Sequence, residues 1–259
     1  MKHTSLLFVS GLLLTAAAGC ASNDEPGKNE PEGPTVVQAP EFPNGTGQPA
    51  SAMDEVGYPA ETGFAIGSVI PNFKFIGYAN YKHPEAGNQL QQVTLSDFYN
   101  PTGDGVFPDG SIYGAGLAKP KALVVLISSV WCGPCNQEAA QVLPVEYPTY
   151  KPMGGHFISV MIDGPTPGDP AKIQHITNWA NSYLSSWAAN DGTVYSLVMD
   201  PAEKVMPMYE PAFPSNLIVR TSDMRIMYRH TGVAQPGGVF WQTFEGVLDG
   251  SITDPAQQL

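Results

Sequence analysis

The sequence predicts a layered α/β fold, in which helices pack on a central β-sheet. Apolar runs of strand length alternate with segments of helical periodicity, and this alternation is typical of such folds. One run, residues 122–127, is apolar throughout, as expected of a central strand buried on both faces. It is followed closely by Trp131-Cys132-Gly133-Pro134-Cys135, where the next helix is expected to begin. Strand, turn and helix together place a cysteine pair at the start of a helix.

The other elements of the predicted fold follow along the chain. We expect strands at residues 156–162 and 195–199, a hairpin of 216–220 and 225–229, and helices at 132–145, 171–187 and 239–248. The helix over 171–187 is expected because Ile173, Ile176 and Trp179 recur at helical spacing. Residues 221–223 supply the turn of the hairpin, and Gly250 ends the last helix.

Composition divides the chain into four parts. Residues 1–19 are typical of a signal peptide, with a positive start at Lys2, an apolar stretch, and small residues before a cut. Residues 20–66 are rich in Pro, Gly, Asn and acids, so we expect a disordered tether, with an ordered arm packed on the domain as the alternative. Residues 67–250 are expected to form one domain with a sizeable core, and residues 251–259 a C-terminal tail.

Cys20 directly follows the expected cleavage site. A cysteine in that position resembles the lipobox of bacterial lipoproteins, a family in which the cysteine is acylated after the preceding peptide is removed. Ala17 stands where that family prefers leucine, and the alternative is an ordinary secretory signal with an incidental cysteine. The resemblance implies a lipid anchor on Cys20 and a place in the cell envelope, on the periplasmic or extracytoplasmic face. The resemblance does not decide between the inner and the outer membrane.

The charge of the chain restricts its partners. The chain carries 12 Lys and Arg against 24 Asp and Glu, a net charge of −12. Loss of residues 1–19 removes Lys2 and no acid, which makes the net charge −13. This charge argues against nucleic acid and against adsorption to anionic lipid through a basic patch. Membrane contact is therefore expected only through acyl chains.

Cys132 and Cys135 are the remaining cysteines, so with Cys20 lipidated they can pair only with each other or with a partner. Cys132 would lie at a helix N-terminus, where free N–H groups and the helix dipole favour a thiolate, so it is the candidate nucleophile. Cys135, one turn in and more buried, is the resolving thiol. An inert disulfide and half of a metal site are the alternatives. A metal site needs two further ligands, and the 5 histidines make no spaced pair, so we expect no metal.

Glu138 follows Cys135 by three residues, so the two side chains project from nearly the same helix face. A carboxylate in this position can take and return the proton of Cys135, provided that partial burial raises its pKa. The alternative is an exposed glutamate in the first turns of a helix.

Four phrases of the sequence resemble thioredoxin-like redoxins of the TlpA/ResA type. Residues 67–73 resemble the family's opening G-x-x-x-P-x-F, and residues 93–98 resemble its V-x-L-S-D-F. Residues 131–138 match W-C-x-P-C-x-x-E, and Phe213-Pro214-Ser215 matches the proline that the family holds cis before a strand. The resemblance covers roughly residues 67–250. It implies a thioredoxin-like three-layer sandwich, a central mixed β-sheet flanked by helices, with an N-terminal β extension.

The resemblance also implies a function and roles for several residues. It implies an extracytoplasmic thiol–disulfide oxidoreductase that needs no cofactor, acts on protein thiols and disulfides, and receives electrons from a membrane-side donor. Glu138 would manage the proton of Cys135, and Pro214 would place Phe213 for backbone pairing with a substrate chain. Pro211 or a plain trans turn is the alternative to a cis Pro214. Trp131 is expected to flank and shield the cysteines, with core packing as the alternative.

The sequence departs from this pattern at several points. Residues 100–119 look like an insertion, and two alanines follow Glu138 where the family usually has a proline. Leu126 stands where thioredoxin carries a buried aspartate, which favours the TlpA/ResA branch. The Gly-Pro dipeptide between the cysteines resembles that of reducing thioredoxins and favours reduction of substrates. We expect a monomer.

Two alternative functions remain open at this point. A thiol peroxidase is the first, although Ser129 stands where peroxiredoxins need a threonine. A non-catalytic redox or Cu(I) carrier is the second, with the thioethers of Met206 and Met208 as soft ligands.

Overall fold

The structure is a computed structural model, and it describes residues 57–81, 90–184, 195–200, 202–208 and 212–255. These residues all belong to the larger of two units, Ala39–Leu259, and the smaller unit is Met1–Gln38. The predicted signal peptide, Cys20 and most of the predicted tether lie outside the described residues and stay predictions. Within the described part of the chain, no helix is long and apolar enough to cross a membrane.

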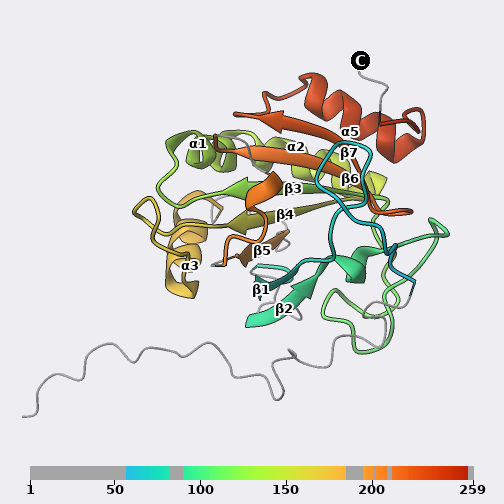
Figure 1. The fold of residues 1–259 in the computed structure, drawn as a ribbon, viewed down its shortest axis with the longest axis horizontal. Helices are drawn as coiled ribbons and strands as arrows, with labels where there is room; N and C mark the ends of the chain where they lie inside the picture. The colour runs from blue at the N-terminus through green and yellow to red at the C-terminus, as the bar shows by residue number, and fades with distance from the viewer. Residues whose placement is uncertain (1–56, 82–89, 185–194, 201, 209–211, 256–259) are drawn as a thin grey trace, which may run out of the picture. The chain divides into compact units, whose positions relative to one another are not determined.

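The described residues form one mixed seven-stranded sheet with the strand order β2-β1-β5-β4-β3-β6-β7 (Figure 1). Its strands are β1 (Lys74–Tyr78), β2 (Leu90–Thr94), β3 (Ala122–Ser128), β4 (Gly155–Met161), β5 (Ser196–Met199), β6 (Ser215–Arg220) and β7 (Arg225–Thr231). The α-helices in the described residues are α1 (Gly133–Gln141), α2 (Leu143–Tyr150), α3 (Ile173–Tyr183) and α5 (Val239–Asp249). β3, β4 and β5 run parallel, and the β1–β2 hairpin joins β5 antiparallel at one edge. The predicted thioredoxin-like class, a central mixed sheet with an N-terminal β extension, is confirmed.

β3 is the central strand, and it is buried along its whole length. Ala122, Val124 and Leu126 face a core that they share with the α-helices. The alternate residues, such as Val125 and Ile127, face a second core on the opposite side of the sheet. This alternation follows from the period of two along a strand, and it explains why the sequence is apolar at both sets of positions.

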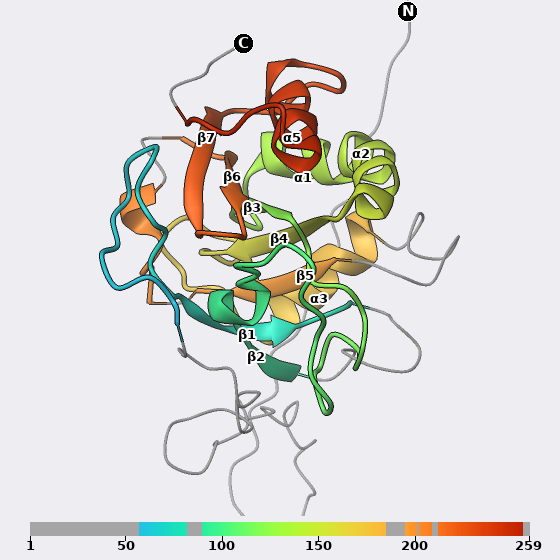
Figure 2. The same ribbon diagram turned by 90° about the vertical axis from the view of Figure 1, so that its right-hand side faces the viewer.

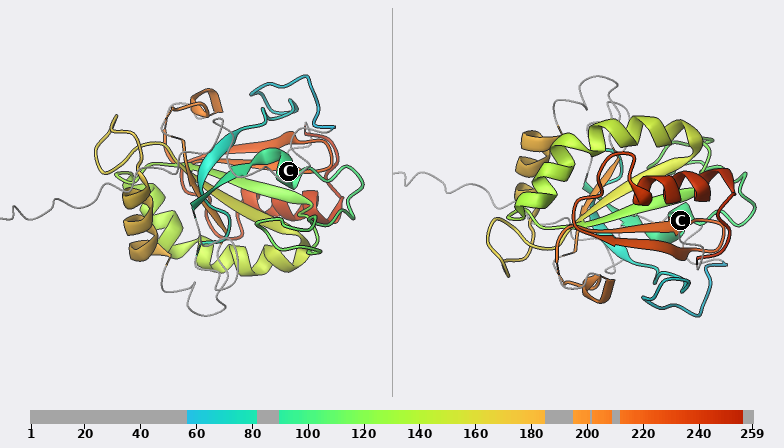
Figure 3. Two further views of the ribbon diagram at one scale, coloured as in Figure 1. Left: turned by 90° about the horizontal axis from the view of Figure 1, so that it is seen from below. Right: turned by 90° about the horizontal axis from the view of Figure 1, so that it is seen from above.

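The two faces of the sheet are covered differently. α1, α2, α3 and α5 all contribute side chains to one core, and Figures 2 and 3 show these helices on a common side of the sheet. An aromatic cluster lies in this core around Phe157, whose ring centroid is 5.0–6.0 Å from those of Tyr147, Tyr195, Trp241 and Phe244. The other core is covered by the segment before β1, by two short 3-10 helices, Leu95–Phe98 and Met206–Met208, and by side chains of the loop over residues 100–119.

The prediction of one continuous helix over residues 132–145 is wrong, because the segment forms two helices that meet at Val142. The break has a sequence cause in Pro144, which lacks an N–H group and whose ring would collide with the carbonyl of residue 140 in a continuous helix. Pro144 instead lies in the first turn of α2, where a missing N–H group is tolerated.

The other predicted elements agree with the structure apart from small shifts of their ends. α3 begins at Ile173 rather than at Ala171, because the Ala171 N–H donates to the carbonyl oxygen of Ile162 and keeps the chain extended. Its predicted last residues, 185–187, lie outside the described residues. α5 ends where Gly250 adopts a left-handed conformation with φ of 81°, which glycine adopts without a steric penalty.

Residues 57–66, which the sequence analysis placed in the tether, contact the domain. The Tyr58 hydroxyl donates to the carbonyl oxygen of Ile70 at 2.7 Å, and the Gly63 N–H donates to that of Val69 at 2.8 Å. The Arg229 guanidinium donates to the carbonyl oxygen of Phe64. For these residues the structure shows a packed arm, which was the alternative to a tether.

Phe157 should be among the most sensitive positions for stability, since it lies fully buried at the centre of the aromatic cluster. We expect Phe157→Ala to lower the free energy of unfolding by about 3–5 kcal/mol, because it leaves a cavity in a packed core. Urea denaturation of the oxidised protein measures this. Phe64→Ala is the matched control, because Phe64 is 38% exposed and the same truncation there should cost under about 0.5 kcal/mol. Equal losses in the two variants would contradict the proposed core.

Candidate active site

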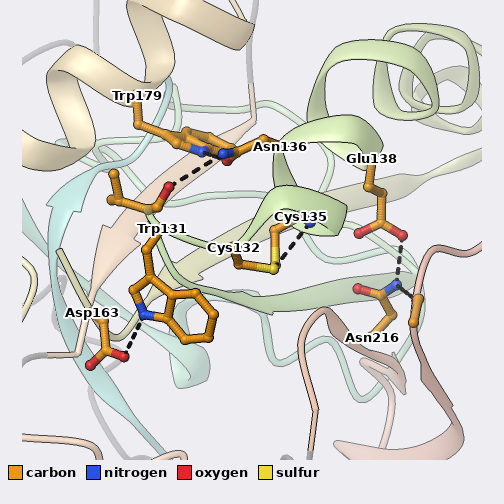
Figure 4. Close-up of a disulfide and its surroundings, with 10 residues drawn as sticks. Trp131, Cys132, Cys135, Asn136, Glu138, Asp163, Trp179 and Asn216 are labelled. Carbon is orange, nitrogen blue, oxygen red and sulfur yellow. Dashed lines mark hydrogen bonds between the residues drawn. A yellow bond between two sulfur atoms is a disulfide. The ribbon is translucent and has the colours of Figure 1, made fainter. Parts of the chain in front are cut away.

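Cys132 and Cys135 form a disulfide at the start of α1, with their Cα atoms 5.3 Å apart (Figure 4). Cys132 is the N-cap residue of this helix, and its sulfur accepts a hydrogen bond from the Cys135 N–H at 3.1 Å. Pro134 occupies the first turn, where its missing N–H group leaves no intrahelical bond unmade. In the reduced protein the same N–H group and the positive end of the helix dipole would stabilise a thiolate on Cys132.

The two sulfurs lie at the same depth. Cys132 and Cys135 are each 2% exposed, so the expectation that Cys135 is the more buried residue is wrong for the oxidised protein. The physical reason is the disulfide itself, since a bond between the sulfurs holds both side chains together beneath the first turn of α1. A difference in access between the two thiols therefore requires reduction.

Trp131 lies at the surface beside this turn rather than in a core. Its side chain is 40% exposed, and its Nε1–H donates to Asp163 Oδ2 at 2.8 Å. Its ring meets the ring of Phe213 edge to face, with the centroids 5.9 Å apart. The alternative of core packing does not describe this residue. Trp131 instead connects the cysteine turn to the loop after β4 and to the loop before β6.

The loop before β6 lies at the same end of the sheet as the cysteines. The Phe213–Pro214 peptide bond is cis, which excludes the plain trans turn at this proline. Ser215 pairs with Ile127 in the antiparallel register of β6 and β3, so Pro214 lies beside Ser128 at the carboxyl end of β3. Pro211, the alternative position for a cis bond, lies outside the described residues.

Glu138 is buried, with 2% of its surface exposed, on the same side of α1 as Cys135. The alternative of an exposed glutamate is therefore wrong. One oxygen, Oε1, accepts two hydrogen bonds, from Asn216 Nδ2 at 2.8 Å and from the Ala234 N–H at 2.8 Å (Figure 4). Since both donors engage Oε1, a proton on the carboxyl group would be carried by Oε2.

The burial of Glu138 determines its acid strength. Burial raises the pKa of Glu138 to about 7, and the hydrogen bonds from Ala234 and Asn216, which favour the carboxylate, offset only part of that rise. The loss of hydration therefore outweighs two good hydrogen bonds. A carboxyl group with this pKa gains and loses its proton close to neutral pH, as a group that exchanges a proton with a thiol requires.

Asn216 is a site residue that the sequence analysis missed. It is fully buried in β6 opposite Leu126, and its Nδ2 also donates to the carbonyl oxygen of Gly232 at 3.4 Å. Its Oδ1 has no hydrogen-bond partner among the described residues. An amide carries both a donor and an acceptor, so Asn216 can donate to a carboxylate or, after rotation of its amide, accept from a carboxylic acid. The available signal was a lone amide in an apolar strand directly after Pro214-Ser215.

A second missed residue, Asn136, holds the start of α1 in place. Its Oδ1 accepts from Trp179 Nε1 at 2.6 Å, and its Nδ2 donates to the carbonyl oxygen of Val130 at 3.3 Å (Figure 4). These bonds connect the cysteine helix to α3 on one side and to the preceding turn on the other. The first turn of α1 is therefore fixed by side chains as well as by the helix itself.

The residues on which the Cu(I) carrier and the peroxidase alternatives depend are not seen to form a metal site or a peroxidase site. Met208 is fully buried in the second core, and the side chain of Met206 is outside what the structure describes. Ser129 is buried, and its hydroxyl has no partner among the described residues. No cluster of three or more His, Cys, Asp or Glu that could hold a metal ion occurs in the described part of the chain.

No protein-family model matches the chain, and no curated protein sequence is significantly similar to it. Solved structures do show similarity. The thioredoxin domain of a thiol-disulfide oxidoreductase from Bacteroides vulgatus is 17% identical, with a TM-score of 0.43, over 74% of this chain and 100% of that one. A thiol:disulfide interchange protein from Bacteroides sp. is 18% identical, with a TM-score of 0.42, over 73% and 93%. A hypothetical protein from Sinorhizobium meliloti is 15% identical, with a TM-score of 0.49, over 77% and 92%.

Glu138 should make the stability of the oxidised protein depend on pH. Because its pKa rises from 4.5 to about 7 on folding, the folded state binds this proton more tightly, and stability falls as the pH rises through this interval. We expect a fall of about 3 kcal/mol from this group, at about 1.4 kcal/mol for each pKa unit. The measurement is urea denaturation at the two ends of the interval.

The contribution of Glu138 is the difference between the wild type and Glu138→Gln, whose side chain does not titrate. Glu146→Gln serves as the control, because Glu146 is also buried and hydrogen-bonded, to the Gly237 N–H, but lies on α2. Burial raises the pKa of Glu146 too, so Glu146 makes its own contribution to the fall in stability with rising pH, and Glu146→Gln measures that contribution separately. A Glu138→Gln variant with the full pH dependence of the wild type would refute the assignment.

Proposed function

We propose that this chain is an extracytoplasmic, membrane-anchored thiol–disulfide oxidoreductase that reduces disulfides of protein substrates through Cys132 and Cys135. The observation that carries the proposal is a closed disulfide at the N-terminus of a helix, with a buried carboxyl group of near-neutral pKa on the same helix face. A purely structural disulfide needs neither the helix N-terminus nor the buried acid. Both have a use if the bond opens and closes.

The first chemical step belongs to Cys132. In the reduced protein its thiolate attacks one sulfur of a substrate disulfide, a mixed disulfide forms on Cys132, and the other substrate sulfur leaves as a thiolate. The Cys135 N–H and the start of α1 stabilise the attacking thiolate. Attack by Cys132 is favoured over attack by Cys135 because only Cys132 occupies the N-cap position.

The second step belongs to Cys135 and Glu138. Cys135 transfers its proton to Glu138 and attacks the sulfur of Cys132, which releases the second substrate thiol and closes the disulfide seen in the structure. Two electrons have then passed to the substrate. Asn216 supports both states of Glu138, because it donates to Oε1 and this bond is kept when Oε2 carries the proton.

The surface around the disulfide offers a place for an extended substrate. The cis peptide bond turns the chain at Pro214 next to the carboxyl end of β3, and the ring of Phe213 contacts that of Trp131 beside the disulfide turn. A substrate chain can pair with the backbone before Pro214, as in other recognition by strand addition. The exposed ring of Trp131 would then flank the substrate disulfide.

The cellular setting of the proposal rests on the N-terminal sequence. A signal peptide over residues 1–19 and a lipid on Cys20 would hold the domain at a membrane surface on the tether. The oxidised form would be reduced again by thiols of a donor at that membrane. No bound cofactor is required, since both electrons travel as thiols.

Replacement of the resolving cysteine gives the most direct test. In Cys135→Ser the first step proceeds and the second cannot, so we expect covalent mixed disulfides between Cys132 and its substrates in the native host. They are detected as higher-mass species on non-reducing gels and identified by mass spectrometry. In Cys132→Ser these species and catalysed insulin reduction should both disappear. A Cys135→Ser protein that traps nothing would count against an enzymatic role.

Glu138 should affect the second step and leave the first unchanged. We expect Glu138→Gln to lengthen the lifetime of a mixed disulfide on Cys132 by roughly 100-fold, the lower end for loss of a proton acceptor. Rapid mixing of the reduced protein with a disulfide-linked peptide, followed by acid quenching, separates the two steps. Glu146→Gln is the control, and its lifetimes should equal those of the wild type. Equal lifetimes in Glu138→Gln would remove Glu138 from the mechanism.

A further inference from the structure

The loop over residues 100–119, which looks like an insertion, is held in a defined conformation by hydrogen bonds. Asn100 is buried, its Nδ2 donates to the carbonyl oxygens of Lys119 and Pro120 at 3.5 and 3.4 Å, and its Oδ1 accepts from the Gly105 N–H at 2.9 Å. Val106 and Ala118 form a bridge that brings the two halves of the loop together. Loops of this length without regular structure usually have a function.

This loop forms one wall of a cavity of about 660 Å³ at the amino ends of β3 and β4, away from the disulfide at the carboxyl end of β3. The volume is typical of sites for small organic ligands. Four aromatic rings line it, those of Phe98, Phe107, Tyr113 and Tyr147. The first three lie within 4.7–6.2 Å of one another, centroid to centroid, and give flat apolar walls.

Lys119 supplies a positive charge to this cavity. The residue is 5% exposed, its Nζ donates to the carbonyl oxygen of Tyr99 at 3.0 Å, and the same atom lies 5.8 Å from the ring centre of Phe107. No carboxylate of a described residue lies within 4.0 Å of Nζ. Burial lowers the pKa of Lys119, and Asp97 opposes this only in part. A buried ammonium with one neutral acceptor lacks the partner that buried charges usually have.

None of the residues that line the cavity is acidic, and the carboxylate of Asp97, which accepts from the Tyr113 hydroxyl at 3.2 Å, acts on Lys119 from outside the lining. His156 adds a neutral acceptor to the lining. The Ser196 hydroxyl donates its single hydrogen to the carbonyl oxygen of Ala79 at 2.6 Å, so His156 must donate from Nε2 to Ser196 Oγ. His156 Nδ1 is then unprotonated. Burial lowers the pKa of His156 to about 3, which keeps the imidazole uncharged at neutral pH. A second ammonium, that of Lys151, lies 5.6 Å from the ring centre of Tyr147 in the same lining.

We propose that this cavity binds a small carboxylate with a flat aromatic body, its carboxylate paired with Lys119 and its ring between the aromatic walls. The charge of the ligand follows from the buried ammonium, and its shape follows from the rings. A phosphate fits less well, because no arginine lines the cavity to bind it through two parallel hydrogen bonds, and aromatic and aliphatic side chains make up much of the lining. The net charge of −12 makes a positive cavity in this chain a local feature rather than a consequence of overall composition.

The test is calorimetric titration of the oxidised full chain with naphthoate, and with naphthalenemethanol as an uncharged probe of the same shape. We expect naphthoate to bind with one-to-one stoichiometry, and the alcohol and inorganic phosphate to bind at least roughly tenfold more weakly. Lys119→Met, which keeps the side-chain length and removes the charge, should weaken naphthoate binding by a similar factor. Lys121→Met is the matched control, because Lys121 is a nearby cation outside the cavity lining, and its binding should be unchanged.

Three results would overturn the proposal: no binding of naphthoate at millimolar concentration, equal binding of naphthoate and naphthalenemethanol, or displacement of naphthoate by equimolar phosphate. The comparison of the probes uses the wild-type protein alone, so the outcome does not depend on whether Lys119→Met folds. Insulin reduction should be the same in both lysine variants, which separates this cavity from the chemistry at Cys132.

Discussion

The burial of β3 on both faces is the constraint on which the rest of the structure depends. Because β3 pairs with β4 on one side and β6 on the other, its register fixes what stands at each of its ends. The pairing of Ile127 with Ser215 places the cis Pro214 at the carboxyl end, next to the turn that carries Cys132. The pairing of Leu126 with Asn216 places the amide that holds Glu138. A shift of one residue would reverse every side chain of β3 between the two cores and separate these groups.

The pKa of the buried Glu138 results from competition between two large effects. A carboxylate removed from water loses several kcal/mol of hydration, and two N–H donors on one oxygen return only part of it. The part of this loss that the hydrogen bonds do not return raises the pKa of Glu138 to about 7. Leu126 leaves β3 apolar, so the buried acid on this side of the sheet comes from α1 rather than from the strand. The loss of hydration that makes the burial of Glu138 unfavourable is thus also what brings its pKa close to neutrality.

Most of the fold could be predicted because its elements have local signals. The all-apolar β3, the helical spacing of Ile176 and Trp179, and Gly250 as a helix end each report on their own neighbourhood. The cysteine pair at the helix start could be predicted for the same reason. Asn216 could not, because its contact with Glu138 joins residues 78 positions apart and depends on the register of two strands. The break at Val142 also has a local signal, because Pro144 lies in the first turn of α2.

The two ends of the sheet provide positive charge in different ways, and this explains the lysines of the cavity. At the carboxyl end of β3, α1 offers the Cys135 N–H and the positive end of its dipole, so a sulfur anion needs no basic side chain. At the amino end the chain presents the C-terminus of α2, whose carbonyl groups carry partial negative charge, with Lys151 as its C-cap residue. Part of the charge of Lys151 is therefore used in stabilising that helix end. The buried ammonium of Lys119 is left as the group whose charge a ligand at this end would neutralise.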